Sequence, residues 1–173
     1  MKLISCLLLF LVLAASVVIA IALRLPAQTT HTRTAKLKQP PEKVFAVLAD
    51  VQRMARWNRN TEKVELVPPI DGKEATRQTF KGGMVVTVIT AESSAPNRLV
   101  RVLGDARAPF SGSWSYRITA TAEGGSDVEL TEISQISNPF YRLMVKIAGP
   151  TKYMDQHLED LSRELEGMAL VKK

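Results

Sequence analysis

The chain has one cysteine and two histidines in 173 residues, and this scarcity excludes several kinds of chemistry. Cys6 has no second cysteine to pair with, so no disulfide forms within the chain and no cysteine-based metal site is available. His31 and His157 form no HxxxH or HExxH motif, and we expect no bound metal. No serine lies in a G-x-S-x-G sequence and no glycine-rich loop is placed to hold phosphate. We therefore expect no cofactor.

The sequence also lacks dense charge of either sign. Basic residues exceed acidic ones by six over the whole chain, and they are scattered. Nucleic-acid binding requires clustered Lys and Arg with aromatic residues among them, and no such stretch exists. We expect no nucleic-acid partner. The mild positive charge fits either a simply solvated surface or a weak attraction to anionic membrane lipid.

A long apolar run opens the chain. Leu3 to Leu23 contains no charge, and only Ser5 and Ser16 are clearly polar. About 20 predominantly apolar residues cross a bilayer as a helix, so residues 1–25 are predicted to be a transmembrane anchor. The alternative is a cleaved signal segment, for which the small residues of Ala20-Ile21-Ala22 would supply a cleavage site. Residues 26–29 form a short linker after the run.

The side of the membrane depends on two opposing tendencies. Basic residues after the run, including Arg24 and Arg33, favour a cytoplasmic domain by the positive-inside rule. A domain that follows a signal-like segment is nevertheless commonly exported. We expect a single-pass protein with its domain on the exported, periplasmic face. No residue pattern indicates a particular oligomeric state.

Residues 30–167 are predicted to form one α+β domain, followed by a tail over 168–173. Pro40-Pro41 opens a first helix, and a second short helix covers Val51 to Trp57. The pattern then changes to alternation, which is typical of strands. The strands are predicted at 30–38, 61–67, 75–81, 84–92, 98–103, 112–121 and 127–137.

The last helix begins at Asn138-Pro139 and carries one apolar stripe at spacings of three, four and seven. Gly149-Pro150 interrupts the stripe and is expected to kink the helix or divide it. The break could act as a hinge or as a rigid kink. The stripe comprises Phe140, Met144, Ile147, Met154, Leu158, Leu161 and Leu165.

Residues 40–50, PPEKVFAVLAD, resemble the opening pattern of the START-like or SRPBCC superfamily. Trp57 resembles the tryptophan of that superfamily's second helix, and Trp114 to Ile118 with Val128 to Thr131 resemble its last hairpin. The superfamily includes the polyketide cyclase/dehydrase, coenzyme Q-binding and pollen-allergen families. The resemblance covers residues 30 to about 167. It implies a helix-grip fold, in which a curved antiparallel sheet wraps around the C-terminal helix and a hydrophobic cavity lies between them.

The predicted ligand-binding residues are those that face this cavity. By alternation and by the helical stripe, the sheet and the last helix should turn apolar side chains toward each other. The alternative is that the same side chains fill a solid core. The predicted lining comprises Trp114, Tyr116, Ile118, Glu132, Phe140, Met144, Ile147, Met154 and Leu158.

Two polar residues are candidates for chemistry. Glu132 falls on the inner face of its strand, where it could bind the polar end of a ligand or act as an acid or base. The competing interpretation is a strand end that returns Glu132 to water. His157 flanks the apolar stripe, and we expect it to be solvated instead of serving as a pocket base.

These observations favour a membrane-tethered binder or carrier of a hydrophobic, lipid-like or aromatic small molecule. The absence of catalytic motifs favours binding over catalysis. The first alternative is a polyketide cyclase or hydrolase-like enzyme that uses Glu132, Tyr116 or His157 for proton transfer. The second alternative is a surface interaction module at the membrane.

Overall fold

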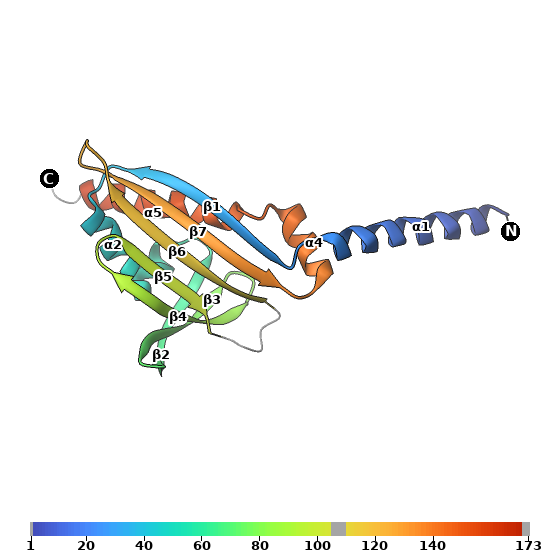
Figure 1. Ribbon diagram of the computed structural model, residues 1–173, viewed down its shortest axis with the longest axis horizontal. Helices are drawn as coiled ribbons and strands as arrows, with labels where there is room; N and C mark the ends of the chain where they lie inside the picture. The colour runs from blue at the N-terminus through green and yellow to red at the C-terminus, as the bar shows by residue number, and fades with distance from the viewer. Residues whose placement is uncertain (1, 105–109, 171–173) are drawn as a thin grey trace.

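A computed structural model describes residues 2–104 and 110–170 of the chain (Figure 1). Its helical elements are α1 (Lys2–Arg24), α2 (Pro41–Ala49), the 3-10 turn η1 (Val51–Arg53), α3 (Met54–Trp57), α4 (Pro139–Ala148) and α5 (Lys152–Leu170). Its strands are β1 (Gln28–Leu37), β2 (Thr61–Ile70), β3 (Lys73–Phe80), β4 (Val85–Ser94), β5 (Arg98–Leu103), β6 (Phe110–Ala120) and β7 (Ser126–Ile136). Helix α5 reaches Leu170, past the predicted start of a tail at 168, and residues 171–173 lie outside the described residues.

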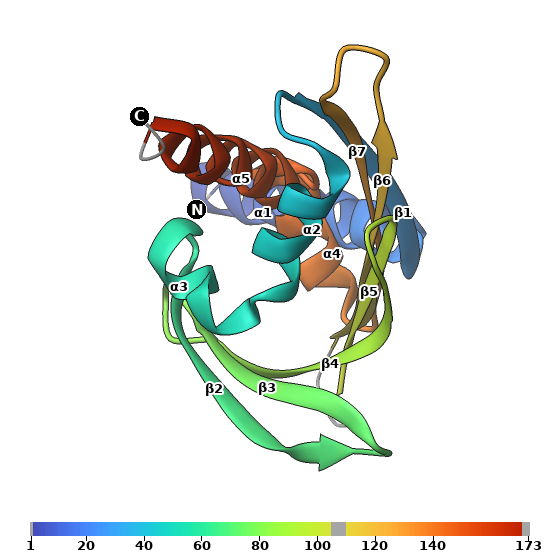
Figure 2. The same cartoon turned by 90° about the vertical axis from the view of Figure 1, so that its left-hand side faces the viewer.

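The strands form one antiparallel sheet in the order β1-β7-β6-β5-β4-β3-β2. The first strand closes against the last, and Gln28 lies opposite Gln135. The sheet is strongly curved, and α5, α2 and α3 lie within its concave side (Figure 2). The predicted helix-grip architecture is therefore confirmed.

The core lies between the inner face of the sheet and α5. Alternate residues of the central strands point inward, as the pattern predicts for a half-covered sheet. From α5, four residues of the predicted stripe enter the same cluster. The buried residues that meet here are Leu99, Tyr116, Ile118, Val128, Leu130, Met154, Leu158, Leu161 and Leu165.

Strand β2 runs beyond its predicted end at Val67, through Pro68 and Pro69 to Ile70. Its pairing with β3 is irregular between Val67 and Ile70, and β2 is an edge strand. Proline cannot donate a ladder hydrogen bond, but an edge or a bulge tolerates it. The predicted strand end was wrong for that reason.

The structure confirms a helix over the N-terminal apolar run. Helix α1 extends away from the sheet (Figure 1), and its described large apolar side chains are exposed. Within the described residues, however, no helix combines the length and the apolar character that a membrane crossing requires. The predicted transmembrane anchor is not supported.

The C-terminal helix is divided in two at Gly149-Pro150. Of the two expected effects, a kink or a division, the structure shows the division. Gly149 has a φ of 93°, which ends α4, and α5 begins at Lys152. At the other end of α4, the Asn138 side chain accepts hydrogen bonds from the N–H groups of Phe140 and Tyr141. The apolar stripe is therefore not continuous, and the two helices point in different directions (Figure 1).

This division corrects the predicted orientation of three residues. Phe140, Met144 and Ile147 were expected to face the sheet, but all three are exposed, and no residue of α4 is buried. Because the break redirects the chain, α4 lies beside α1 instead of over the inner face of the sheet.

Candidate functional site

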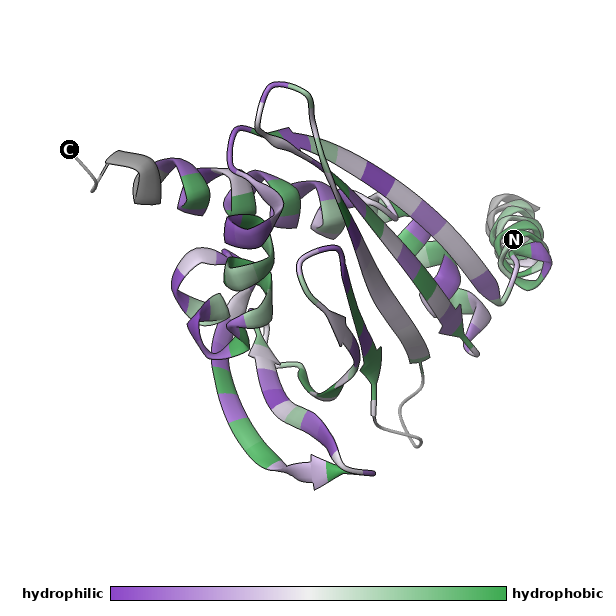
Figure 3. Cartoon of the chain, turned by 60° about the vertical axis from the view of Figure 1, so that its left-hand side comes forward, coloured by the Kyte–Doolittle hydropathy of each residue, from purple (hydrophilic) through white to green (hydrophobic). Residues whose placement is uncertain are grey.

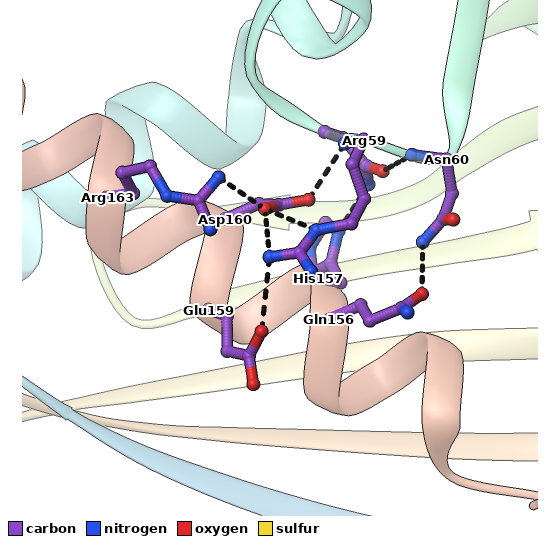
Figure 4. Close-up of polar contacts among 8 residues, drawn as sticks. Arg59, Asn60, Gln156, His157, Glu159, Asp160 and Arg163 are labelled. Carbon is purple, nitrogen blue, oxygen red and sulfur yellow. Dashed lines mark hydrogen bonds and ion pairs between the residues drawn. The ribbon is translucent and has the colours of Figure 1, made fainter.

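A three-residue loop between α3 and β2 is hydrogen-bonded to α5 at every position (Figure 4). Each of residues 58–60 uses its side chain to reach the same region of the helix, between residues 156 and 160. The loop thus fixes α5 over the inner face of the sheet. The pairs are Asn58 with His157 (2.8 Å), Arg59 with Asp160 (2.8 Å) and Asn60 with Gln156 (3.0 Å).

Asp160 has a fully buried side chain and is the acceptor for this connection. Arg59 donates to it from both its backbone N–H and its Nε, each at 2.8 Å, and Arg163 donates at 3.0 Å. Burial alone would raise the pKa of Asp160, but the hydrogen bonds and charge of Arg59 outweigh it and hold the pKa below its ordinary value. The carboxylate stays ionised.

His157 is buried, contrary to the expectation that it would be solvated. The N–H of Asn60 donates to Asn58 Oδ1 at 2.9 Å, which leaves the Asn58 NH₂ group facing His157 Nδ1. Nδ1 must therefore accept, and the ring proton sits on Nε2, which donates to Tyr116 Oη at 3.1 Å. Burial lowers the pKa of His157 to about 4, so the ring is neutral.

This tautomer decides what Tyr116 can do. Both nitrogens of His157 are already engaged, so His157 cannot remove the phenol proton. Burial raises the pKa of Tyr116 to about 12, so the hydroxyl stays protonated. The Tyr116 hydroxyl is therefore a hydrogen-bond donor and not half of an acid–base pair.

Arg101 is the polar residue of the inner face that the sequence analysis missed. It is buried, and its Nη2 donates to the carbonyl of Leu48 at 2.7 Å. Its Nε and Nη1 are also buried, and neither has an acceptor among the residues that the structure describes. Burial lowers its pKa. The sequence did contain a pattern that predicts this position of Arg101. Leu99, Arg101 and Leu103 alternate along the strand, which places an arginine on an otherwise apolar inner face.

Glu132 lies on the inner face of β7, so the strand-end interpretation was wrong. It is opposite Trp114, which donates its indole N–H to the carboxylate at 2.9 Å. Burial raises the pKa of Glu132, while the hydrogen bond from Trp114 and the charge of His31 act against that rise. The carboxyl is thus partly shielded and easier to protonate than an exposed glutamate.

Burial along β6 and β7 shows where this inner face opens. Tyr116 and Leu130 are buried, whereas Trp114 and Glu132, one step further along the strands, are only half-buried. Helix α5 begins nearby, where Asp155 pairs with Arg33 at 2.8 Å. Beyond that point no helix within residues 2–104 and 110–170 covers the inner face, because α4 is redirected toward α1. We call the half-buried pair Trp114 and Glu132 the mouth of the site.

Of the predicted lining, four residues meet in the buried core, and two form the mouth. Tyr116, Ile118, Met154 and Leu158 fill the space under α5. Two hollows lie elsewhere: a groove of about 170 Å³ where α2 approaches Glu164, and a depression of about 360 Å³ around Ser111, Ser113 and Ile133. Neither hollow is lined by Tyr116.

No group of three or more His, Cys, Asp or Glu side chains within residues 2–104 and 110–170 is arranged to hold an ion. What the inner face offers instead is a set of hydrogen-bond donors, Arg101 and Tyr116, behind an aromatic and acidic mouth.

Solved structures with the same fold include two proteins described as aromatase/cyclases. The Zhui aromatase/cyclase from Streptomyces sp. R1128 has a TM-score of 0.68 at 18% identity, over 80% of this chain and 94% of that one. A START superfamily protein from Mycobacterium smegmatis has a TM-score of 0.64 at 16% identity. The match covers 80% of this chain and 98% of that one. The di-domain aromatase/cyclase BexL of the BE-7585A pathway gives 0.65 at 11% identity; the match covers 84% of this chain but only 52% of BexL.

These identities establish a shared fold and nothing more. No curated protein sequence matches the chain. The family model described as "Polyketide cyclase / dehydrase and lipid transport" matches residues 28–166, which is most of the chain and all of the sheet. The sequence resemblance is thereby confirmed, and the chain belongs to the polyketide cyclase/dehydrase and lipid transport family.

Proposed function

We propose that the domain binds a hydrophobic small molecule that carries an oxygen acceptor, and that Arg101 and Tyr116 donate hydrogen bonds to this oxygen. The observation that carries the proposal is the pair of buried Arg101 N–H groups without an acceptor. A buried donor without a partner costs about 1–3 kcal/mol, and more when it is charged. A bound carboxylate, enolate or carbonyl oxygen would remove that cost.

The surroundings of Arg101 support the same ligand class. Arg101 lies directly opposite Trp114, and the next inner pair along the two strands is Leu99 opposite Tyr116. The oxygen of a ligand that entered at the mouth would pass the Trp114 ring and meet the two donors behind it. Tyr116 and the α5 residues Met154 and Leu158 are buried in one cluster, so we expect side chains or the start of α5 to move when a ligand binds.

Binding fits these residues better than catalysis by Tyr116 and His157. A proton-transfer mechanism requires a base, and in this arrangement His157 is neutral and already hydrogen-bonded at both nitrogens. The family description includes lipid transport, and the aromatase/cyclase structures share only the fold. We therefore favour a carrier of a hydrophobic molecule over an enzyme.

The test compares two probes that differ in their oxygen. 2-Naphthoate and 2-methylnaphthalene have the same rings, and their binding to the full chain can be followed by quenching of tryptophan fluorescence. We expect tighter binding of 2-naphthoate, and an Arg101→Met variant should lose about tenfold of that preference. Arg98→Gln is the matched control, because Arg98 is on the same strand but pairs with Glu92. Equal binding of the two probes by the unmodified protein would refute the proposal.

Glu132 supports a second candidate, a cyclase-type enzyme. Its raised pKa and its position at the mouth are what a general acid or base requires. If this is the function, Glu132→Gln should abolish turnover of a polyketide-like substrate while leaving 2-naphthoate binding intact. Unchanged turnover in that variant would exclude a proton-transfer role for Glu132.

We also propose that the exposed apolar side chains of α1 keep the domain at a membrane, on the exported face. The support is the concentration of exposed apolar residues on a helix that extends away from the sheet. Protease added to spheroplasts of cells that express the chain, in which the outer membrane is open and the inner membrane is intact, should then digest the domain. Protection until the cells are lysed would place the domain inside.

A further inference from the structure

Helix α4 presents an apolar face that stays largely exposed in the part of the chain that the structure describes, although the Tyr141 ring stacks on Phe110. We call this the α4 face and define it as Phe140, Tyr141, Met144 and Ile147, all of which are exposed. Met144 is 64% and Ile147 is 78% exposed. Helix α1, whose described large apolar side chains are also exposed, contacts α4 directly. The two helices lie side by side at one end of the molecule, and hydrophobic residues recur along both (Figure 3).

The α4 face is held in a fixed position by a single arginine. Arg142 donates to the carbonyl of Leu25 at 2.8 Å, to that of Ile136 at 2.7 Å and to that of Ser137 at 2.8 Å. These three bonds join the end of α1, the end of β7 and the start of α4. The α4 face is therefore exposed because of how α4 is attached to the rest of the fold. It is not exposed because the helix is loosely attached.

Charge is distributed unevenly between this region and the rest of the chain. Residues 1–41 and 133–154, which include α1 and α4, contain eight Lys and Arg and no Asp or Glu. The remainder contains 15 basic and 17 acidic residues. All of the net positive charge thus belongs to the two segments that expose apolar side chains. Lys146 and Lys152, at the two sides of the helix break, are both exposed.

We propose that the α4 face docks on an anionic lipid surface. Met144 and Ile147 would enter the boundary between head groups and acyl chains, and Lys146 and Lys152 would lie among the anionic head groups. An amphipathic helix binds a membrane in this way through its buried apolar area and its attraction to acidic lipid. The absence of acidic residues from both segments fits lipid phosphates specifically. The docking concerns a surface separate from Arg101 and does not depend on ligand binding.

A fluorescent label on α4 tests the contact itself. In a Cys6→Ser background, the native chain has no other cysteine, so Ile147→Cys can be labelled with an NBD fluorophore. With vesicles of phosphatidylcholine and phosphatidylglycerol in equal parts, we expect a blue shift and protection from an aqueous quencher. The control is Glu123→Cys, an exposed position on the turn between β6 and β7, whose label should stay in water. A chain that binds vesicles with both labels in water is held by α1 alone, and that result overturns the proposal.

Charge variants test the lipid specificity. Lys146→Gln and Lys152→Gln should each weaken binding to the anionic vesicles roughly fivefold. Lys73→Gln, at an exposed position on β3, should leave it unchanged. Equal binding to vesicles of phosphatidylcholine alone would contradict the proposal. All three variants should bind 2-naphthoate normally, so failure of the docking and failure of the proposed ligand site would be told apart.

Discussion

The buried His157 should make the stability of the domain depend on pH between its ordinary pKa of 6.5 and its lowered pKa of about 4. In the unfolded chain the imidazole takes up a proton near its ordinary pKa of 6.5, whereas in the folded protein it does so only near about 4. Between these values the unfolded state binds more protons than the native state, so stability is lost as the pH falls. At about 1.4 kcal/mol per pKa unit, the loss reaches about 3 kcal/mol between pH 7 and pH 4.

Urea unfolding from pH 7 to pH 4 measures this loss, with tryptophan fluorescence as the signal because Trp57 lies 5.2 Å from the His157 ring. A His157→Gln variant should be less stable than the unmodified protein at pH 7. Its free energy of unfolding should, however, change much less between pH 7 and pH 4. Nuclear magnetic resonance of the two imidazoles gives the pKa directly. If the His157 ring titrates near 6.5, the buried tautomer argument is wrong.

Three further predictions concern the structure around the site. Asp160→Asn should lower the free energy of unfolding by about 2–3 kcal/mol at pH 7, because the buried carboxylate loses charged hydrogen bonds. The difference should shrink below about pH 4 as the wild-type carboxylate is protonated, and Glu159→Gln, 63% exposed, should cost under about 0.5 kcal/mol. In an ultraviolet titration of the native protein, the phenolate of Tyr116 should appear only near pH 12, and its appearance at pH 10 would contradict its burial. Gly112→Ala should lower the melting temperature, because its Cβ would lie 2.6 Å from the carbonyl oxygen of Ile133, and an unchanged melting curve would show that the strands can separate at little cost.

The fold was predictable because its main signals are local. Threonine content predicted the first strand, and alternation with turn signals predicted the other six. The stripe through Leu158, Leu161 and Leu165 predicted the helix that the sheet grips. The direction of α4 was not predictable in the same way. A helical stripe shows which residues share a face, but the φ of 93° at Gly149 turns that face away from the sheet. The spacing of apolar residues does not predict this backbone angle.

The site was only partly predictable, because its polar residues depend on partners far apart in sequence. Tyr116 and Glu132 could be placed on inner faces by alternation alone. The burial of His157 could not, because it depends on Asn58, a residue on a loop 99 positions away. Arg101 shows the opposite case: its alternation was visible in the sequence, but only the structure shows that two of its donors have no acceptor.

The pairing of the first strand with the last has a consequence for synthesis of the chain. Because β1 closes against β7, with Gln28 opposite Gln135, the sheet cannot be completed until β7 has left the ribosome. At 5–20 residues per second, this delay lasts roughly 5 to 20 seconds. Throughout that time α1 is already outside the ribosome, and its apolar surface has no folded domain beside it. The N-terminal helix therefore meets chaperones, targeting factors or lipid as an isolated segment, and its destination can be decided before the domain that it carries exists.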